Sequence, residues 1–431
     1  MIQAASVTGS GQADELRQEM ADGLVAEGWI TSPHVEAAFR AVPRHLFTPP
    51  GTPLETAYNG HRAPVLKSGA DGVNLSSVSG PWLQAKMIAQ AGIGPGMRVL
   101  EIGSAGYNAA LLAEATGEHV VSVDIDPDIT ARASAALGAA GYAGLVTVVT
   151  ADGEHGFPDR APYDAIVVTA AAWDLPPAWA EQLTGDGRLS VPLVMNTFTR
   201  SLGFRRTGDH WESLSAQLCG FVPMQGMGQA PLRRLSLADP DGGSVTLRLG
   251  DETEPDDPGL LDGALRTGPV TVWSGLTIAD QVGFEDLHLW LAGFLAGFCR
   301  IDGSDSQALP AAEGNKTWFG FGGVLSDSFS VMAMRKTGVP GAEFEFGARA
   351  FGPHAGAAAE ALIARIAAWD ARGRAIPGDA FAYWPAGIDI PPLGDLVSVF
   401  RKRHGSATVT WPPAALSPPV MACPLLTVPD K

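Results

Sequence analysis

Between residues 97 and 170 the chain alternates between two hydrophobic periods, and this alternation constrains the fold more than any other feature. Four short, β-branched and continuously apolar runs predict strands: MRVLEIG at 97–103, HVVSVDID at 119–126, LVTVVTADG at 145–153 and YDAIVVTA at 163–170. Helical patterns separate them at 106–117 and 126–142. Strands that are apolar on both faces are typical of parallel sheets covered by helices on both sides. The sequence therefore predicts an α/β fold with a doubly wound, mostly parallel sheet.

The segments on either side of this region suggest two domains. Two helices are expected at 12–29 and 32–42, a further helix and strand at 176–193, and antiparallel hairpins at 199–224. Acidic, turn-rich stretches at 238–244 and 250–259 indicate a boundary. We therefore predict a first domain at 1–229 and a C-terminal α+β accessory domain at 230–431, in which 277–299 and 354–373 are helical and a Pro-rich tail starts at 412.

Composition and charge narrow the possible partners. The net charge is −17, so binding of nucleic acid or an anionic membrane would require a local basic cluster. The best candidate, Arg401 to His404, is short, and we interpret it as a solvated face. Cys219, Cys299 and Cys423 lie far apart, which argues against a disulfide framework and a structural zinc site. The N-terminus lacks the pattern of a signal peptide, and we expect a cytoplasmic protein with no metal, nucleic-acid or membrane partner.

The loop after the first strand, Gly103-Ser104-Ala105-Gly106, is the strongest indication of a ligand. Asp124 ends the second strand 21 residues beyond Gly103, close to the ~20 expected for an acid that binds ribose hydroxyls. The pattern indicates an adenosine-containing cofactor, either a nicotinamide dinucleotide or S-adenosylmethionine; a tight turn without a ligand is the alternative. The order of the glycines fits GxGxxG poorly. Glu101 could meet the ammonium of a bound amino acid and Asp152 could accept from adenine, which favours the methyl donor.

In order and spacing, VPRHLF, LEIGSAGYNAALLAE, VVSVDIDP, FPDRAPYDAIVVTAAA and FVPM resemble the protein-L-isoaspartate O-methyltransferase family over about residues 15–228. The resemblance implies a Rossmann-like class I methyltransferase fold and S-adenosyl-L-methionine as cofactor. It also places Ser79, in SSVSGP at 76–81, beside the reacting carboxylate. Gln84 stands where family members often have His. The residues assigned to cofactor binding are Ser76, Ser77, Gln84, Glu101, Gly103, Ser104, Gly106, Asn108, Asp124, Ile125, Asp152, Gly153 and Thr169.

The whole chain also resembles the FxLD-system methyltransferases that occur beside ribosomally made lanthipeptides and graspetides. The shared segments are TAAAWDLPPAWAEQL with Trp173-Asp174, CGFVPMQG, and RKRHGSATVTWP near the C-terminus. This resemblance implies methylation of an aspartate in a cyclised precursor peptide, whose ester closes to an aspartimide and can open to isoaspartate. Residues 230–431 would then recognise the peptide.

The sequence is compatible with three functions. They are methylation of a ribosomal peptide, repair of isoaspartyl residues in damaged proteins, and a catalytically silent cofactor-binding scaffold. A carboxylate nucleophile has a reference pKa of about 4 and needs no general base. It does need a donor that holds one oxygen while the other attacks, and we expect the Ser79 hydroxyl to be that donor. The alternative role for Ser79 is to cap the helix that follows it.

Overall fold

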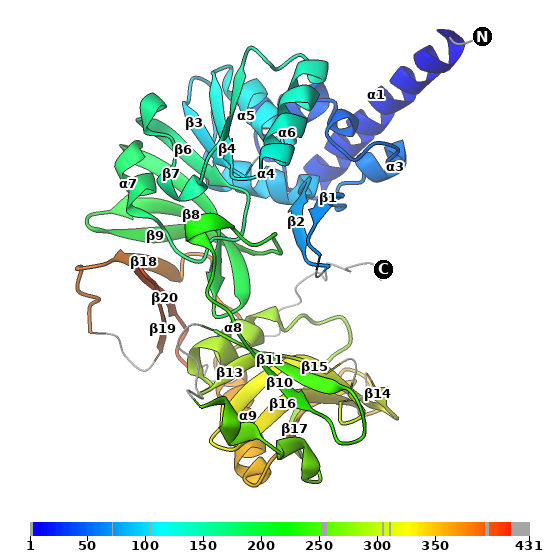
Figure 1. The fold of residues 1–431 in the computed structure, drawn as a ribbon, viewed down its shortest axis with the longest axis vertical. Coiled ribbons are helices and arrows are strands. Elements are labelled where there is room, and N and C mark those ends of the chain that lie inside the picture. Colours follow the sequence, from blue (N-terminus) through cyan, green and yellow to red (C-terminus); the bar gives the residue numbers. More distant parts are fainter. Residues whose placement is uncertain are drawn as a thin grey trace.

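The computed structural model describes residues 3–70, 72–103, 105–250, 257–303, 306–309, 312–392 and 396–414. In this part of the chain two large sheets are joined through helix α8, Glu285–Phe294 (Figure 1). A separate hairpin, β1 (Val65–Ser68) and β2 (Asn74–Ser77), pairs only with itself among the described strands.

The first sheet contains the predicted parallel strands. Five neighbouring strands are parallel, in the order β5 (Val146–Thr150), β4 (Val120–Asp124), β3 (Val99–Ile102), β6 (Tyr163–Val168) and β7 (Leu183–Met195). The chain moves outward from β3 to β4 and β5 and then returns to place β6 on the other side of β3. This reversal creates a switch point, where open α/β sheets bind ligands at the carboxyl ends of their strands.

Helices cover both faces of the parallel strands, as predicted. The helices of the first half are α1 (Gln3–Ala26), α2 (Pro33–Ala41), α3 (Leu54–Ala57), α4 (Pro81–Gln90), α5 (Tyr107–Thr116), α6 (Pro127–Ala140) and α7 (Pro177–Gln182). The N-cap of α6 is Asp126, whose side chain accepts from the Asp128 N–H, and the helix ends at Gly141 in the left-handed conformation. Local capping residues thus set both ends of this helix.

The sheet continues through antiparallel strands, and here the predicted domain boundary differs from the structure. Strands β8 (Phe198–Thr207) and β9 (His210–Leu218) follow β7, and then β18 (Phe381–Pro385), β20 (Gly405–Thr410) and β19 (Val397–Arg401) complete the edge. Ala382 pairs with Glu212 and Tyr383 with Trp211. Strands β18, β19 and β20 therefore belong to the first sheet and not to an accessory domain that extends from 230 to the C-terminus.

The accessory unit is an insertion between β9 and β18. Its strands run in the order β10 (Arg233–Ala238), β11 (Ser244–Leu249), β13 (Phe298–Asp302), β15 (Lys316–Leu325), β16 (Ser328–Lys336), β17 (Phe344–Phe351) and β12 (Val270–Ile278), with β14 (Ala312–Glu313) beside β15. Helix α9, Ala355–Asp370, packs on β12, β16 and β17. Strands β16 and β17 form an antiparallel pair, and together with α9 they agree with the α+β character and the helix at 354–373 that the sequence predicts here.

The helix predicted at 277–299 is shorter than expected. Residues 270–278 form strand β12, and α8 covers only Glu285–Phe294. Gly297 takes a positive φ of 63°, and Phe298 then begins β13. A glycine in that conformation turns the chain, so the apolar run is divided between a helix and a strand. No helix within the described ranges is long and apolar enough to cross a membrane.

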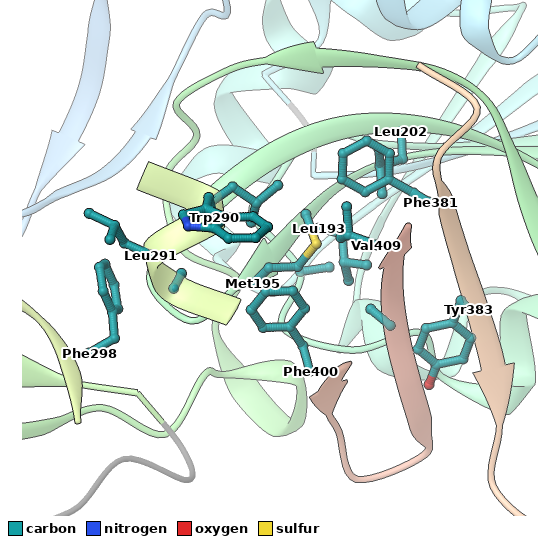
Figure 2. Close-up of a cluster of buried hydrophobic side chains, with 14 of the residues drawn as sticks. Leu193, Met195, Leu202, Trp290, Leu291, Phe298, Phe381, Tyr383, Phe400 and Val409 are labelled. Atoms are coloured by element: carbon teal, nitrogen blue, oxygen red, sulfur yellow. The ribbon is translucent and has the colours of Figure 1, made fainter. Parts of the chain in front are cut away.

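One hydrophobic core connects the two sheets. Figure 2 shows Trp290 and Leu291 of α8 between residues of both parts of the chain. Leu193 and Met195 come from β7 of the first sheet, whereas Phe298 comes from β13 of the inserted sheet. The Trp290 ring meets the Trp411 ring edge-on with centroids 5.0 Å apart, and its Nε1–H donates to the Arg365 carbonyl. Because α8 is buried between the sheets, the inserted unit is part of the same folded body as the first sheet.

Candidate active site

A cavity opens at the carboxyl ends of β3, β4 and β6, at the switch point of the sheet. It encloses about 730 Å³, including space that is open to solvent. Eleven of the residues predicted to form the site line this cavity. They are Ser76, Ser77, Ser79, Gln84, Glu101, Gly103, Asn108, Asp124, Ile125, Gly153 and Thr169.

Two of the described residues predicted for the site, Gly106 and Asp152, do not line the cavity. Gly106 is the N-cap of α5 and has a φ of 84°, and an added Cβ would lie 3.1 Å from Phe47 and 3.3 Å from the Ala133 Cα. Both Asp152 oxygens accept backbone N–H groups, from Glu154 at 3.0 Å and Met227 at 2.9 Å. Contact of Asp152 with adenine therefore stays a prediction. Ser104 lies outside the described residues.

The Gly103 loop is shaped by close contact with the neighbouring strand. Gly103 has a φ of 92°, and a Cβ there would lie 2.7 Å from Thr169 Oγ1. Thr169 donates to the Gly103 carbonyl at 2.8 Å and thus ties the end of β6 to the loop. A side chain at Gly103 would strain the backbone and displace Thr169, so the glycine is required for the shape of this cavity wall.

Glu101 is completely buried at the base of the cavity. Its carboxylate accepts from the Ser122 hydroxyl and from Asn108 Nδ2. Burial raises the pKa of this carboxyl to about 7, although the two hydrogen bonds act in the opposite direction. Asn108 Oδ1 is buried and has no hydrogen-bond partner among the described residues. An ammonium group would satisfy this oxygen and favour the ionised form of Glu101.

Asp124 lies at the end of β4, where it can reach a second part of a ligand. Its Oδ1 accepts from the Asp126 N–H at 2.9 Å, which fixes the orientation of the carboxylate. Glu101, Asp124 and Asn108 thus place two carboxylates and one amide oxygen along the cavity. Such acceptors fit the ammonium and the ribose hydroxyls of S-adenosylmethionine, so these residues would hold that cofactor.

Ser79 lies on the cavity wall and does not cap the next helix. The N-cap of α4 is Gly80, and it makes no side-chain capping bond. Ser79 is 9% exposed, and Arg44 donates hydrogen bonds to the residues around it. The buried Arg44 guanidinium donates to the Val78 carbonyl at 3.2 Å and to Gln84 Oε1 at 3.3 Å. Arg44 was not predicted as a site residue, although it belongs to the VPRHLF motif.

A second part of the wall was also missed. Val222, Pro223, Met224 and Gln225 line the cavity, and backbone hydrogen bonds join this segment to Ala171. The segment includes part of the FVPM motif, which was the one signal for it in the sequence. The other lining residues outside the prediction are Leu75, Ile102, Ala105, Val123, Asp126, Ile129 and Ala170.

The basic turn at 401–404 was predicted to be a solvated face. Arg401 and Arg403 are exposed, in agreement with this, whereas Lys402 and His404 are half-buried. The His404 N–H donates to Asp174 at 2.6 Å, and the His404 ring lies 3.2 Å from Glu154. Arg403 Nη1 donates to the Met227 carbonyl at 3.0 Å. The turn between β19 and β20 therefore supports the segment that follows the Val222–Gln225 wall.

Comparisons with known proteins identify relatives of the first half of the chain. A family model described as protein-L-isoaspartate(D-aspartate) O-methyltransferase matches residues 15–229. A protein-L-isoaspartate O-methyltransferase from Hyperthermus butylicus is 35% identical over 223 residues, which are 49% of this chain and 89% of the relative. One from Methanoculleus marisnigri is 42% identical over 179 residues, or 41% of this chain and 76% of the relative.

Solved structures of similar proteins were also found. One protein-L-isoaspartate O-methyltransferase aligns with 85% of this chain and 95% of its own, at 20% identity and a TM-score of 0.47. A putative protein-L-isoaspartate O-methyltransferase from Plasmodium falciparum, in complex with S-adenosyl-L-homocysteine, aligns with 48% of this chain and 98% of its own. Its identity is 16% and its TM-score 0.41.

Proposed function

The chain belongs to the protein-L-isoaspartate(D-aspartate) O-methyltransferase family, and from this premise we propose that it methylates the free carboxylate of an isoaspartyl residue in a peptide or protein. The coarser activity follows from the family: the chain is a carboxyl O-methyltransferase with the class I fold that uses S-adenosylmethionine. The observation that carries the proposal is the position of Ser79, on the same cavity as the carboxylates of Glu101 and Asp124, which are expected to bind the cofactor.

Methyl transfer requires little from the protein beyond alignment of the methyl donor and the acceptor carboxylate. When bound, S-adenosylmethionine supplies a methyl group on a positively charged sulfur. The acceptor carboxylate is already ionised at neutral pH, with a reference pKa of about 4, so no general base is needed. The Ser79 hydroxyl donates to one carboxylate oxygen and leaves the other free to attack. The strand-end loops and the hairpin β1–β2 line the cavity in which the two groups would be aligned.

The test is a methylation assay with the whole chain and labelled S-adenosylmethionine. A hexapeptide with one isoaspartyl residue is compared with the same peptide carrying a normal aspartyl residue at that position. We expect base-labile methyl ester on the isoaspartyl peptide only. Equal labelling of both peptides, or of neither, would contradict the proposal.

A second candidate is methylation of a normal aspartate in a ring-closed ribosomal peptide, followed by closure of the ester to an aspartimide. The inserted sheet supports it, because this sheet lies outside residues 15–229, which carry the family match. The same assay with a cyclised precursor peptide tests this candidate. A methyl ester on the cyclised peptide, but not on the isoaspartyl hexapeptide, would favour it over the first proposal.

A further inference from the structure

Three arginine side chains form a row across neighbouring strands of the inserted sheet. Arg234 of β10 pairs directly with Arg248 of β11, and Arg248 pairs directly with Arg300 of β13. Directly opposite residues on antiparallel strands project from the same face, and such strands lie ~4.8 Å apart. We call these three residues the arginine row.

The arginine row lies on the solvent side of the sheet at this position. Arg234 and Arg300 are exposed, and the Arg248 side chain is 43% exposed. The alternate residues Leu247 and Ile301 point to the other face and are buried in a separate hydrophobic cluster. The alternation therefore assigns the arginines to the accessible face.

Placing like charges directly opposite one another destabilises a sheet. Although the Arg300 residue as a whole is exposed, desolvation of its guanidinium lowers its pKa, and the positive charge of Arg248 lowers this pKa further. Within the described ranges, only Asp302 supplies a carboxylate within ion-pair distance of the row, 3.8 Å from Arg248. In a chain of net charge −17, this local excess of positive charge points to a ligand that brings carboxylates.

The arginine row also lies near the carboxyl edge of the parallel strands of the first sheet, which is the edge where the cavity opens. Strand β7 is parallel to β6 and extends beyond it, since Leu193 pairs with Ala172, after the end of β6. The hairpin from β7 to β8 therefore projects from the carboxyl edge, where the cavity opens. At its tip the Phe198 ring centroid lies 5.7 Å from the Arg300 guanidinium carbon.

We infer that the arginine row binds an acidic, extended segment of the polypeptide whose carboxylate is methylated. The inference rests on the proposed function in one respect, because it takes the acceptor to be a polypeptide. An extended peptide presents alternate side chains on one face, which suits a row of donors on a sheet. A nucleic acid fits less well, since its long polyanionic backbone would be repelled by the acidic remainder of the chain.

The experiment measures binding separately from methylation. Fluorescence anisotropy is recorded for a labelled 20-residue isoaspartyl peptide carrying a Glu-x-Glu-x-Glu segment, and for the same peptide with Gln at these positions. Two peptide versions place the segment before or after the isoaspartyl residue. The proteins are the whole wild-type chain, the double variant Arg234→Gln/Arg248→Gln, and Arg160→Gln as a matched control. Arg160 is exposed but precedes β6, at the opposite edge of the sheet. Arg300 is left intact because its guanidinium lies over Phe198.

We expect the double variant to bind the acidic peptide about five- to tenfold more weakly, with unchanged binding of the Gln peptide and a wild-type result for Arg160→Gln. The difference should shrink as salt is added. Equal binding of the acidic peptide by all three proteins would overturn the inference, and so would tighter binding of an oligonucleotide of equal charge. If the acidic peptide binds through the arginine row but is not methylated, the proposed function fails and the docking surface stands.

Discussion

At the scale of single residues, Glu101 should determine how cofactor binding depends on pH. Its pKa is raised to about 7 by burial, from an ordinary value of 4.5. The neutral form therefore contributes stability that is fully present below pH 4.5 and is lost as the pH rises through 7. A cationic ligand group needs the ionised form, so affinity should rise with pH, by at most ~10-fold per unit, and level off above about pH 7.

The measurement is calorimetric titration with S-adenosylhomocysteine from about pH 5.5 to 8.5. Glu101→Gln serves as the comparison, because protonation of the ligand itself affects the affinity of both proteins equally. We expect the pH dependence to be much weaker in the variant. Parallel profiles for the two proteins would mean that the ammonium does not approach Glu101.

Ser79→Ala should separate catalysis from cofactor binding. Removing one donor that positions the acceptor carboxylate should cost ~10²-fold in kcat, while the affinity for S-adenosylhomocysteine should stay within about twofold. Single-turnover kinetics and calorimetry measure the two quantities. The matched control is Ser68→Ala, because Ser68 is exposed on the neighbouring hairpin and bonds Asn74. Full activity of Ser79→Ala would remove Ser79 from the mechanism.

At the scale of elements, Lys67 connects the hairpin β1–β2 to the start of helix α6. A two-stranded hairpin is marginally stable alone. Lys67 donates to Asp126 at 2.6 Å and to Asp128 at 2.9 Å, both at the start of α6. Leu75, Ser76 and Ser77 of the same hairpin line the cavity. The lysine thus joins the cavity wall to the helix that follows Asp124.

Lys67→Met keeps most of the apolar stem but removes this connection. We expect faster hydrogen exchange at 65–77 and a several-fold weaker affinity for S-adenosylhomocysteine, with both differences smaller at high salt. Lys336→Met, at the end of β16 in the inserted sheet, is the matched control. Unchanged exchange at 65–77 would show that other contacts hold the hairpin.

At the scale of the whole molecule, the shared core should make the two sheets unfold together. Trp290 is 2% exposed and packs between them (Figure 2). Trp290→Ala should lower the free energy of unfolding by ~3–5 kcal/mol and shift one common transition. Calorimetry combined with near-ultraviolet circular dichroism tests this. The control Leu232→Ala, at a residue 51% exposed, should change stability by less than ~0.5 kcal/mol. Two separate transitions in Trp290→Ala would indicate independent domains.

The same core predicts the behaviour of a fragment ending at residue 229. Such a fragment loses β18, β19 and β20 from the first sheet and exposes Leu193 and Met195, which α8 and these strands help to bury. We expect an aggregating product without a cooperative melting transition. A soluble fragment that binds S-adenosylhomocysteine would show that the inserted unit and the last strands are dispensable for folding.

Local sequence was sufficient for the parallel strands and most of the cavity wall. A few neighbouring residues determine three of these features. They are the strands that lack polar alternation, the positive φ of Gly103, and the position of Asp124 at a strand end. Parallel strands bring their carboxyl ends to one edge, so knowing the strand ends was enough to bring Glu101, Gly103, Asp124, Gly153 and Thr169 to one cavity.

Tertiary structure decided what depends on pairing between distant segments. Nothing local in 381–410 specifies that β18 pairs with β9, across more than 160 residues, and not with the strands of the inserted sheet. The Val222–Gln225 wall and the arginine row likewise depend on which strands become neighbours and in which register. Hydrophobic periodicity determines which face of a strand is buried, but the choice of partner follows from packing of the whole chain around α8.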